Sequence, residues 1–85
     1  MAKYKIRVKK SAEKDILSYD KQIRKRILNT IHKLKQNPYL KSKKLSISEN
    51  LYRVRVGKYR IAYEIIKKDS IIMIYKVGHR KNVYD

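Results

Sequence analysis

Hydrophobic and basic residues alternate at the start of this chain in the way that a half-buried strand requires. Between Lys3 and Lys9 the odd-numbered positions are all basic, and the even-numbered ones are Tyr4, Ile6 and Val8. Successive side chains of a strand point to opposite faces. The pattern therefore predicts a strand with one apolar face and one basic outer face.

The next segment has the period of a helix. Ser11 is suited to be an N-cap, because its hydroxyl can accept a hydrogen bond from a backbone N–H of the first turn. A short helix from there to about Ser18 would direct Ala12, Ile16 and Tyr19 toward the core.

A second, longer helix is predicted from Lys21 to about Gln36. Asp20 precedes it as a suitable N-cap. Asn37-Pro38 is expected to stop it, since the residue before a proline is pushed out of the helical region. The apolar positions of this helix form one stripe of helical period, made of Ile23, Ile27, Leu28, Ile31 and Leu34.

The segment LYRVRVGKYRIAYE, residues 51–64, predicts a β-hairpin. Two alternating runs flank Gly57-Lys58, and a two-residue loop with glycine first is typical of a type II′ turn. Folding there would place the apolar residues of both strands on one face, in the pairs Val56–Tyr59, Val54–Ile61 and Tyr52–Tyr63.

The same register puts Arg55 directly opposite Arg60 on the other face, with Arg53 one step further along. Like charges directly opposite each other destabilise a sheet. Arginine is suited to planar recognition of phosphate, and a rigid hairpin would fix the geometry of all three. We interpret the three as a phosphate site; the alternative, a solvated basic face in a basic protein, is equally compatible with composition alone.

A last strand is predicted from about Ser70 to Val77, after a turn at residues 67–69, and Gly78 is expected to end it. This strand is apolar on both parities, as in strands covered on both faces. A loop is expected over residues 41–50, with Leu45 and Ile47 forming a short extended piece.

These elements, in the order β-α-α-β-β-β, predict an α+β fold. A helical pair would pack on one face of a mainly antiparallel sheet, and the three hairpin arginines would project from the other face. The 85 residues are enough for one domain and too few for two, so residues 1–85 are expected to form a single domain.

The charge of the chain restricts its partners. Lys and Arg number 24 against 7 acidic residues, a formal net charge of +17, which attracts polyanions. Nucleic acid and an acidic protein fit this charge better than a membrane does, because the longest apolar run, Ile71 to Tyr75, is too short to span a bilayer. The absence of cysteine excludes disulfides and thiolate metal sites. The cytoplasm is the default location, and neither a metal nor a small-molecule cofactor is expected.

The tail GHRKNVYD adds further candidate residues. It supplies Arg80, Lys81 and His79, whose pKa neighbouring arginines should lower, leaving a neutral imidazole able to transfer a proton. A lone histidine at a strand end is more often structural. Tyr84 could anchor the tail or stack on an RNA base. Additional RNA contacts are expected from Lys58, Lys81, Lys25 and Lys33.

With GHRKNVYD and LYRVRVGKYRIAYEI together, the chain resembles the RelE branch of the RelE/ParE superfamily of toxin–antitoxin toxins, over essentially its whole length. The resemblance implies a ribosome-dependent mRNA endoribonuclease that cuts codons in the A site, beside the 16S rRNA. It also implies silencing by a small acidic antitoxin encoded beside it. The family's site residues fall here on Arg53, Arg55, Arg60, Arg80 and Tyr84.

Cleavage without a metal requires the 2′-hydroxyl to lose a proton, attack its own phosphate in line and expel the 5′-oxygen. Arg55, Arg60 and Arg80 are expected to stabilise the charge that develops on the phosphate, while Arg53 orients the RNA backbone. His79 is the first candidate for proton transfer, with Tyr84 stacking or sharing that role. Two alternatives stay open: a ParE-like gyrase inhibitor and a non-catalytic RNA-binding or ribosome-associated protein.

Overall fold

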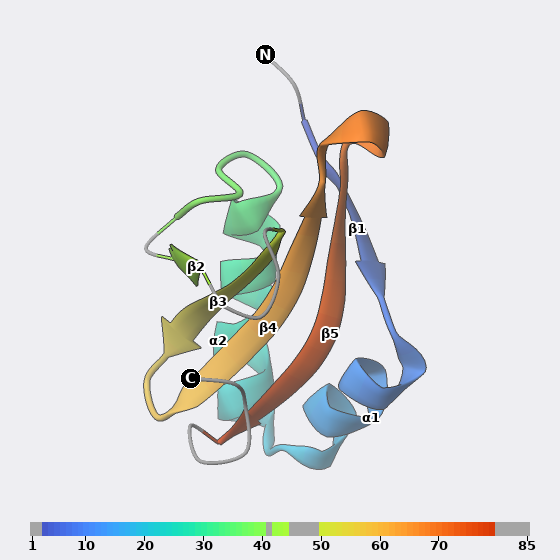
Figure 1. Cartoon of the computed structure of the whole chain (residues 1–85). Helices are drawn as coiled ribbons and strands as arrows, with labels where there is room; N and C mark the ends of the chain where they lie inside the picture. Colours follow the sequence, from blue (N-terminus) through green and yellow to red (C-terminus); the bar gives the residue numbers. More distant parts are fainter. Residues whose placement is uncertain (1–2, 41, 45–49, 80–85) are drawn as a thin grey trace.

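The computed structural model describes residues 3–40, 42–44 and 50–79. Within these residues two helices pack on a five-stranded sheet of order β1-β5-β4-β3-β2 (Figure 1). β1 pairs with β5 in parallel and the other neighbouring strands are antiparallel, which confirms the predicted α+β fold. In chain order the elements are β1 (Lys5–Val8), α1 (Lys10–Ser18), α2 (Lys21–Leu34), β2 (Ser42–Lys44), β3 (Leu51–Val56), β4 (Tyr59–Ile66), the 3-10 helix η1 (Lys67–Asp69) and β5 (Ile71–His79).

α1 begins earlier than its sequence suggests. Its N-cap is Lys9, which makes no side-chain cap, so the prediction that Ser11 caps this helix was wrong. The reason is the sheet: the N–H of Lys9 still donates to the carbonyl of Ile74 (3.0 Å), and the chain turns into the helix at the next residue. Ala12 and Ile16 are buried, as predicted.

α2 begins as predicted and ends sooner. The carboxylate of Asp20 accepts a hydrogen bond from the N–H of Ile23 (3.0 Å), which confirms the N-cap. The helix stops at Leu34, before the expected Gln36. Leu28, a member of the predicted apolar stripe, is 48% exposed, so the buried part of the stripe does not include it. Successive residues of a helix differ in direction by about 100°, so the side chain of Leu28 points away from the side on which its neighbour Ile27 is buried.

The β3–β4 hairpin has the predicted register, residue for residue. Val56 pairs with Tyr59 across Gly57-Lys58. Gly57 has a φ of +60°, while among the described residues other than glycine only Ser70 has a positive φ. Positive φ at the first loop residue alone is the signature of a type II′ turn.

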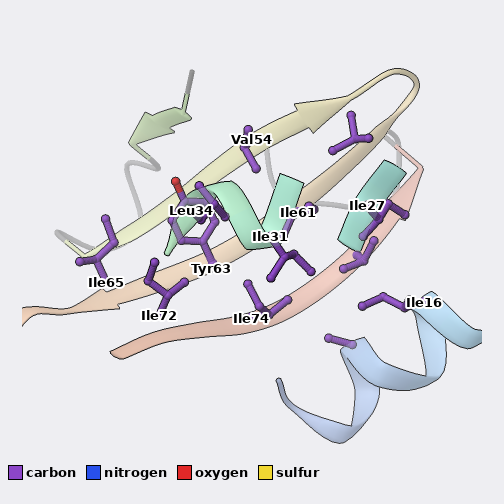
Figure 2. Packing of buried hydrophobic residues seen from close by; sticks show 13 residues of the cluster. Ile16, Ile27, Ile31, Leu34, Val54, Ile61, Tyr63, Ile65, Ile72 and Ile74 are labelled. Atoms are coloured by element: carbon purple, nitrogen blue, oxygen red, sulfur yellow. The ribbon is translucent and has the colours of Figure 1, made fainter. Parts of the chain in front are cut away.

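The core lies between the helices and the sheet, as Figure 2 shows. Side chains of α2 point onto the face of β3, β4 and β5, and Ile16 of α1 extends the cluster toward the end of β5. Tyr63 is fully buried, and its hydroxyl donates to the carbonyl of Pro38 (2.6 Å). The residues labelled in Figure 2 are Ile16, Ile27, Ile31, Leu34, Val54, Ile61, Tyr63, Ile65, Ile72 and Ile74.

β5 is longer than predicted. It continues to His79, and Gly78 lies inside the strand, where it pairs with Arg60 of β4, so the expectation that Gly78 ends the strand was wrong. The predicted turn at residues 67–69 is present as η1. The predicted loop contains β2, which pairs with β3, whereas Leu45 and Ile47 lie outside the described residues.

Candidate nucleic-acid interface

The three hairpin arginines share the face of the sheet away from the helices. Arg55 pairs directly with Arg60, and Arg53 pairs with Ala62. Arg60 in turn pairs with Gly78 on its other side. The long side chains thus have small neighbours: alanine stands opposite Arg53 and glycine opposite Arg60. This arrangement leaves room for guanidinium groups to lie across the strands.

The arginines lie on the predicted face but differ in exposure. Arg55 is exposed, whereas Arg53 is 9% exposed and Arg60 is 4% exposed. The sequence did not indicate that two of the three are buried. Burial holds the two guanidinium groups in fixed positions, whereas Arg55 is the member of the set that a ligand in solution reaches directly.

His79 lies on the opposite face of the sheet from Arg60. It pairs with Tyr59, and the two rings meet edge to face at 5.9 Å between centroids. Tyr59 contacts Tyr19, beside α1, with ring centroids 4.8 Å apart. The sequence placed His79 near the arginine cluster; because neighbouring strand residues alternate between faces, it is Gly78 that shares the face of Arg60.

Three of the tail residues predicted for the site, Arg80, Lys81 and Tyr84, lie outside the described residues. Arg80 follows His79 directly in the chain, and His79 is the last residue of β5. The end of β5 is therefore the point from which the chain enters this part of the predicted site.

Three of the four lysines predicted to contact RNA lie in the described residues, and these three are exposed. Lys58 is the second residue of the hairpin turn, and Lys25 and Lys33 lie on α2. Lys33 and Arg55 both line a hollow of about 220 Å³ between α2 and β3, together with Thr30, Leu40 and Val54. One of the predicted RNA-binding lysines thus lines the same hollow as Arg55, although the Arg55 side chain belongs to the face of the sheet away from α2.

Arg26 is a cation near this region that the sequence analysis did not single out. Its Nη2 lies 3.0 Å from the position that a Cβ on Gly57 would occupy. The guanidinium of Arg26, on α2, therefore lies against the hairpin turn at Gly57, the residue before Lys58. The sign of this contact in the sequence is Gly57, because a residue without a side chain permits the close approach of another group.

The other end of the arginine face is closed by a different group of residues. Glu64, two residues beyond Ala62 on β4, accepts a hydrogen bond from the hydroxyl of Tyr75 (2.7 Å). This bond, together with burial, raises the pKa of Tyr75. The Lys9 ammonium lies 4.3 Å from the centre of the Tyr75 ring, a cation–π contact. The arginines in the middle of this face therefore lie next to the Glu64 carboxylate, which already accepts a hydrogen bond from the neutral hydroxyl of Tyr75.

The composition of the described residues limits the class of site. In residues 3–40, 42–44 and 50–79 there is no group of three or more His, Cys, Asp or Glu side chains that could hold a metal ion. Neither described helix is long and apolar enough to cross a membrane. What these residues offer is an arginine cluster with lysines around it.

Comparisons with known proteins give a consistent result. The family described as ParE toxin of type II toxin–antitoxin system, parDE, matches residues 6–84. Toxin RelE3 of Methanocaldococcus jannaschii is 36% identical over 86 residues, which cover 95% of this chain and 96% of that toxin. Sequence similarity thus extends over nearly the whole chain.

Solved structures agree with the sequence matches. A chain of the archaeal RelE–RelB complex from Pyrococcus horikoshii OT3 has a TM-score of 0.83 and 29% identity, covering 98% of this chain and 100% of that one. A chain of the RelB–RelE antitoxin–toxin complex from Methanococcus jannaschii has a TM-score of 0.73 and 34% identity, covering 93% and 95%. Both similar structures are complexes of RelE with RelB, and the one from Methanococcus jannaschii is described as an antitoxin–toxin complex.

Proposed function

Since this chain belongs to the RelE/ParE superfamily of toxins of type II toxin–antitoxin systems, we propose that it is an endoribonuclease that cleaves mRNA in the ribosomal A site. In this proposal residues 1–85 form a single toxin domain, and the protein acts in the cytoplasm. Support for the nuclease branch comes from relatives named RelE toxins and from the arginines of the hairpin.

The observation that carries the proposal is the direct pairing of Arg55 with Arg60 on the face away from the helices. Two guanidinium groups at adjacent positions repel each other, and an anion that contacts both offsets this repulsion. A phosphodiester is such an anion, and it matches the planar donor geometry of arginine. Arg60, at 4% exposed, is held in place, and the exposed Arg55 completes the contact from the hairpin edge.

The proposed reaction needs no metal. The 2′-hydroxyl gives up its proton, its oxygen forms a bond to the adjacent phosphorus, and the bond from phosphorus to the 5′-oxygen breaks. The 5′-oxygen takes up a proton, so the products are a 2′,3′-cyclic phosphate and a 5′-hydroxyl. Negative charge on the phosphate oxygens grows in the transition state, and prepositioned guanidinium groups stabilise it there more than in the ground state.

The arginines have different roles in this scheme. Arg55 contacts the reacting phosphate, with Arg60 beside it and Arg80 contributed by the tail. Arg53, buried beside Ala62, orients the RNA backbone. Proton transfer is assigned to Tyr84 ahead of His79, because the ring of His79 lies with Tyr59 on the other face of the sheet. Positioning by the ribosome supplies the in-line geometry, which is worth a large factor in rate by itself.

Outside this centre, lysines bind the RNA backbone by charge. Lys33 shares a hollow with Arg55, Lys58 extends from the turn, and Lys25 lies on the outer side of α2. Lys81 follows Arg80 in the tail. Contacts of this kind are independent of sequence and weaken as salt rises.

The proposed regulator is a small acidic antitoxin. Similar toxins have been crystallised as RelE–RelB complexes, and a chain with a net charge of +17 attracts an acidic partner. Binding of such a partner also removes part of the toxin's charge repulsion.

Cleavage of a defined mRNA in a reconstituted translation reaction tests the proposal. The wild-type chain should stop translation and leave mRNA cut at the A-site codon, mapped by primer extension. Arg55→Ala should lower the cleavage rate on the order of 100-fold, as expected for loss of one transition-state donor. The matched control is Arg7→Ala, an exposed arginine on β1 separated from β4 by β5. Intact mRNA with the wild-type chain, or equal loss in both variants, contradicts the proposal.

The matching family carries the ParE description, so inhibition of DNA gyrase is the second candidate function. A supercoiling assay with purified gyrase separates the two. Inhibition of supercoiling together with intact mRNA would replace the nuclease assignment, whereas a protein that binds ribosomes and affects neither reaction is a passive RNA binder.

A further inference from the structure

The edge of β5 that faces away from β4 has different partners along its length. On this side β1 pairs with β5 as far as Ile74, opposite Val8, and the chain then leaves the sheet to form α1. The end of β5, from Tyr75 to His79, therefore has no neighbouring strand on that edge within the described sheet. Backbone N–H and C=O groups at a strand edge require other partners.

α1 and its C-cap residue Tyr19 supply these partners with side chains. The hydroxyl of Ser11 donates to the carbonyl of Tyr75 (3.4 Å). The N–H of Val77 donates to Oδ2 of Asp15 (3.3 Å), and the hydroxyl of Tyr19 donates to the carbonyl of Val77 (3.0 Å). In Figure 1, α1 lies beside this end of β5, beyond the end of β1. Asp15 and Tyr19 thus engage both backbone groups of one strand residue.

The spacing of Ser11 and Asp15 matches the strand. The two are four residues apart, a rise of about 6 Å along a helix. Tyr75 and Val77, two residues apart on the strand, are separated by about 6.6–6.8 Å, which is the interval between successive backbone groups that face one edge. Tyr19, the C-cap residue of α1, adds a bond to the second backbone group of Val77.

Tyr19 makes a second contact, which also lies at the end of β5. Its ring packs on Tyr59, which pairs with His79 across the β4–β5 ladder. Burial, with the nearby Asp15 carboxylate, raises the pKa of Tyr19. The hydroxyl therefore stays protonated and remains a donor to Val77.

Fixing Val77 fixes the residues that follow it. Its backbone groups turn toward α1, so those of Gly78 turn toward β4, where Gly78 pairs with Arg60. After His79 the chain continues into Arg80. The position of Val77 therefore determines how Gly78, the small neighbour of Arg60, lies against β4.

We propose that Asp15 and Tyr19 are positioning residues for the nuclease site: by holding Val77 they set the end of β5, with Gly78, against Arg60. This inference rests on the proposed function. Neither residue touches the RNA. They act through the strand, as supports that keep catalytic groups within the narrow limits that the reaction requires.

The test compares variants that remove these bonds with variants that keep them. Tyr19→Phe keeps the ring on Tyr59 and removes the donor, and Asp15→Ala removes the acceptor. Both should lower the rate of a single round of mRNA cleavage on saturating ribosomes by on the order of 10- to 100-fold, as small misplacements of catalytic groups do. The affinity for ribosomes should stay unchanged, because neither side chain contacts RNA.

Conservative variants distinguish positioning from general stabilisation. Asp15→Asn keeps an oxygen acceptor for Val77 and should restore cleavage to near the wild-type rate. Tyr75→Phe removes another hydroxyl of the same strand, the one bonded to Glu64, and should cleave normally. Full cleavage by both Tyr19→Phe and Asp15→Ala, or equal losses in Tyr75→Phe, overturns the proposal.

Amide hydrogen exchange provides a measurement that needs no nuclease assay. In Asp15→Ala and Tyr19→Phe, exchange should accelerate at Val77, Gly78 and His79 and stay at the wild-type rate in α2. Unchanged exchange at the end of β5, or uniform acceleration across the protein, overturns the positioning role. If the wild-type chain fails to cut mRNA, the proposed function fails, while the exchange result still decides whether α1 holds this strand.

Discussion

Arg55 and Arg60 lie directly opposite each other across the β3–β4 hairpin, yet Arg55 is exposed and Arg60 is only 4% exposed. Two cations that oppose each other on one sheet face thus occupy different environments. Repulsion acts on both, but the packing of the side chain benefits Arg60 alone. The two residues should therefore respond differently to the same substitution.

Arg55→Ala should leave the free energy of unfolding unchanged or raise it by a few tenths of a kcal/mol, because it removes the repulsion from an exposed position. Arg60→Ala should lower it by about 1–3 kcal/mol, because the buried stem of the side chain loses its packing. Urea unfolding of the two variants measures the difference. Equal changes in both would show that the burial of Arg60 does not contribute to stability.

Gly57→Ala should destabilise the hairpin by about 1–3 kcal/mol, because Gly57 has a φ of +60°. A Cβ there would also meet Nη2 of Arg26 at 3.0 Å. Thermal unfolding of Gly57→Ala, alone and combined with Arg26→Ala, separates the two causes, and Lys58→Ala serves as control. If removal of Arg26 restores full stability, the contact rather than the backbone conformation is the cause.

Tyr63→Phe should lower the free energy of unfolding at neutral pH by about 1 kcal/mol, because the carbonyl of Pro38 loses its donor. The loss should shrink as pH rises. Burial raises the pKa of Tyr63 to about 12, so this hydroxyl contributes stability fully below its ordinary value of about 10, and the contribution disappears as pH rises from 10 toward 12. Urea unfolding of both proteins over this range measures it. A difference between them that stays constant would contradict the assigned pKa.

Arg80→Ala should abolish growth inhibition when the chain is expressed without an antitoxin, while the fold survives. The residue follows the last residue of β5, so its loss should cost little packing. Circular dichroism and urea unfolding verify the fold of the variant, and colony counts after induction measure the toxicity. Full toxicity in a folded Arg80→Ala protein would remove this residue from the catalytic set.

The rate of association with the acidic antitoxin should fall steeply as salt rises, while the dissociation rate changes little. Attraction between a chain of +17 and an acidic partner is screened as the Debye length shrinks from about 30 Å at 0.01 M to about 3 Å at 1 M. Apolar contacts, from a partner helix or an added strand, would hold the complex once formed. Stopped-flow mixing at several salt concentrations measures both rates. An association rate independent of salt means that the charge serves ribosomal RNA alone.

Local patterns predicted much of this fold. The register of the hairpin follows from Gly57 and the alternation on either side of it, because a two-residue turn leaves one pairing. The cap at Asp20 likewise depends on bonds within four residues of the chain. Such features require no knowledge of distant segments.

Features that depend on distant segments were missed. Burial of Arg53 and Arg60, the exposure of Leu28 and the placement of His79 beside Tyr59 are set by how elements pack. The parallel pairing of β1 with β5 joins residues from opposite ends of the chain, and no local pattern encodes it. The hydrogen bonds of Asp15 and Tyr19 with Val77 likewise could not be predicted, because they depend on the pairing of β1 with β5 ending at Ile74.

Because β5 lies between β1 and β4, a growing chain on a ribosome cannot close the sheet until Ile71–His79 has been made. Until then β1 has no partner, and the outer edge of β4 stays open. Pairings between residues so far apart in sequence also form slowly, since a long loop must be closed first. Gly78, the neighbour of Arg60, is thus among the last parts of the proposed site to be added. Under the proposed function, the order of synthesis therefore delays any cleavage of mRNA on the ribosome that is translating the toxin.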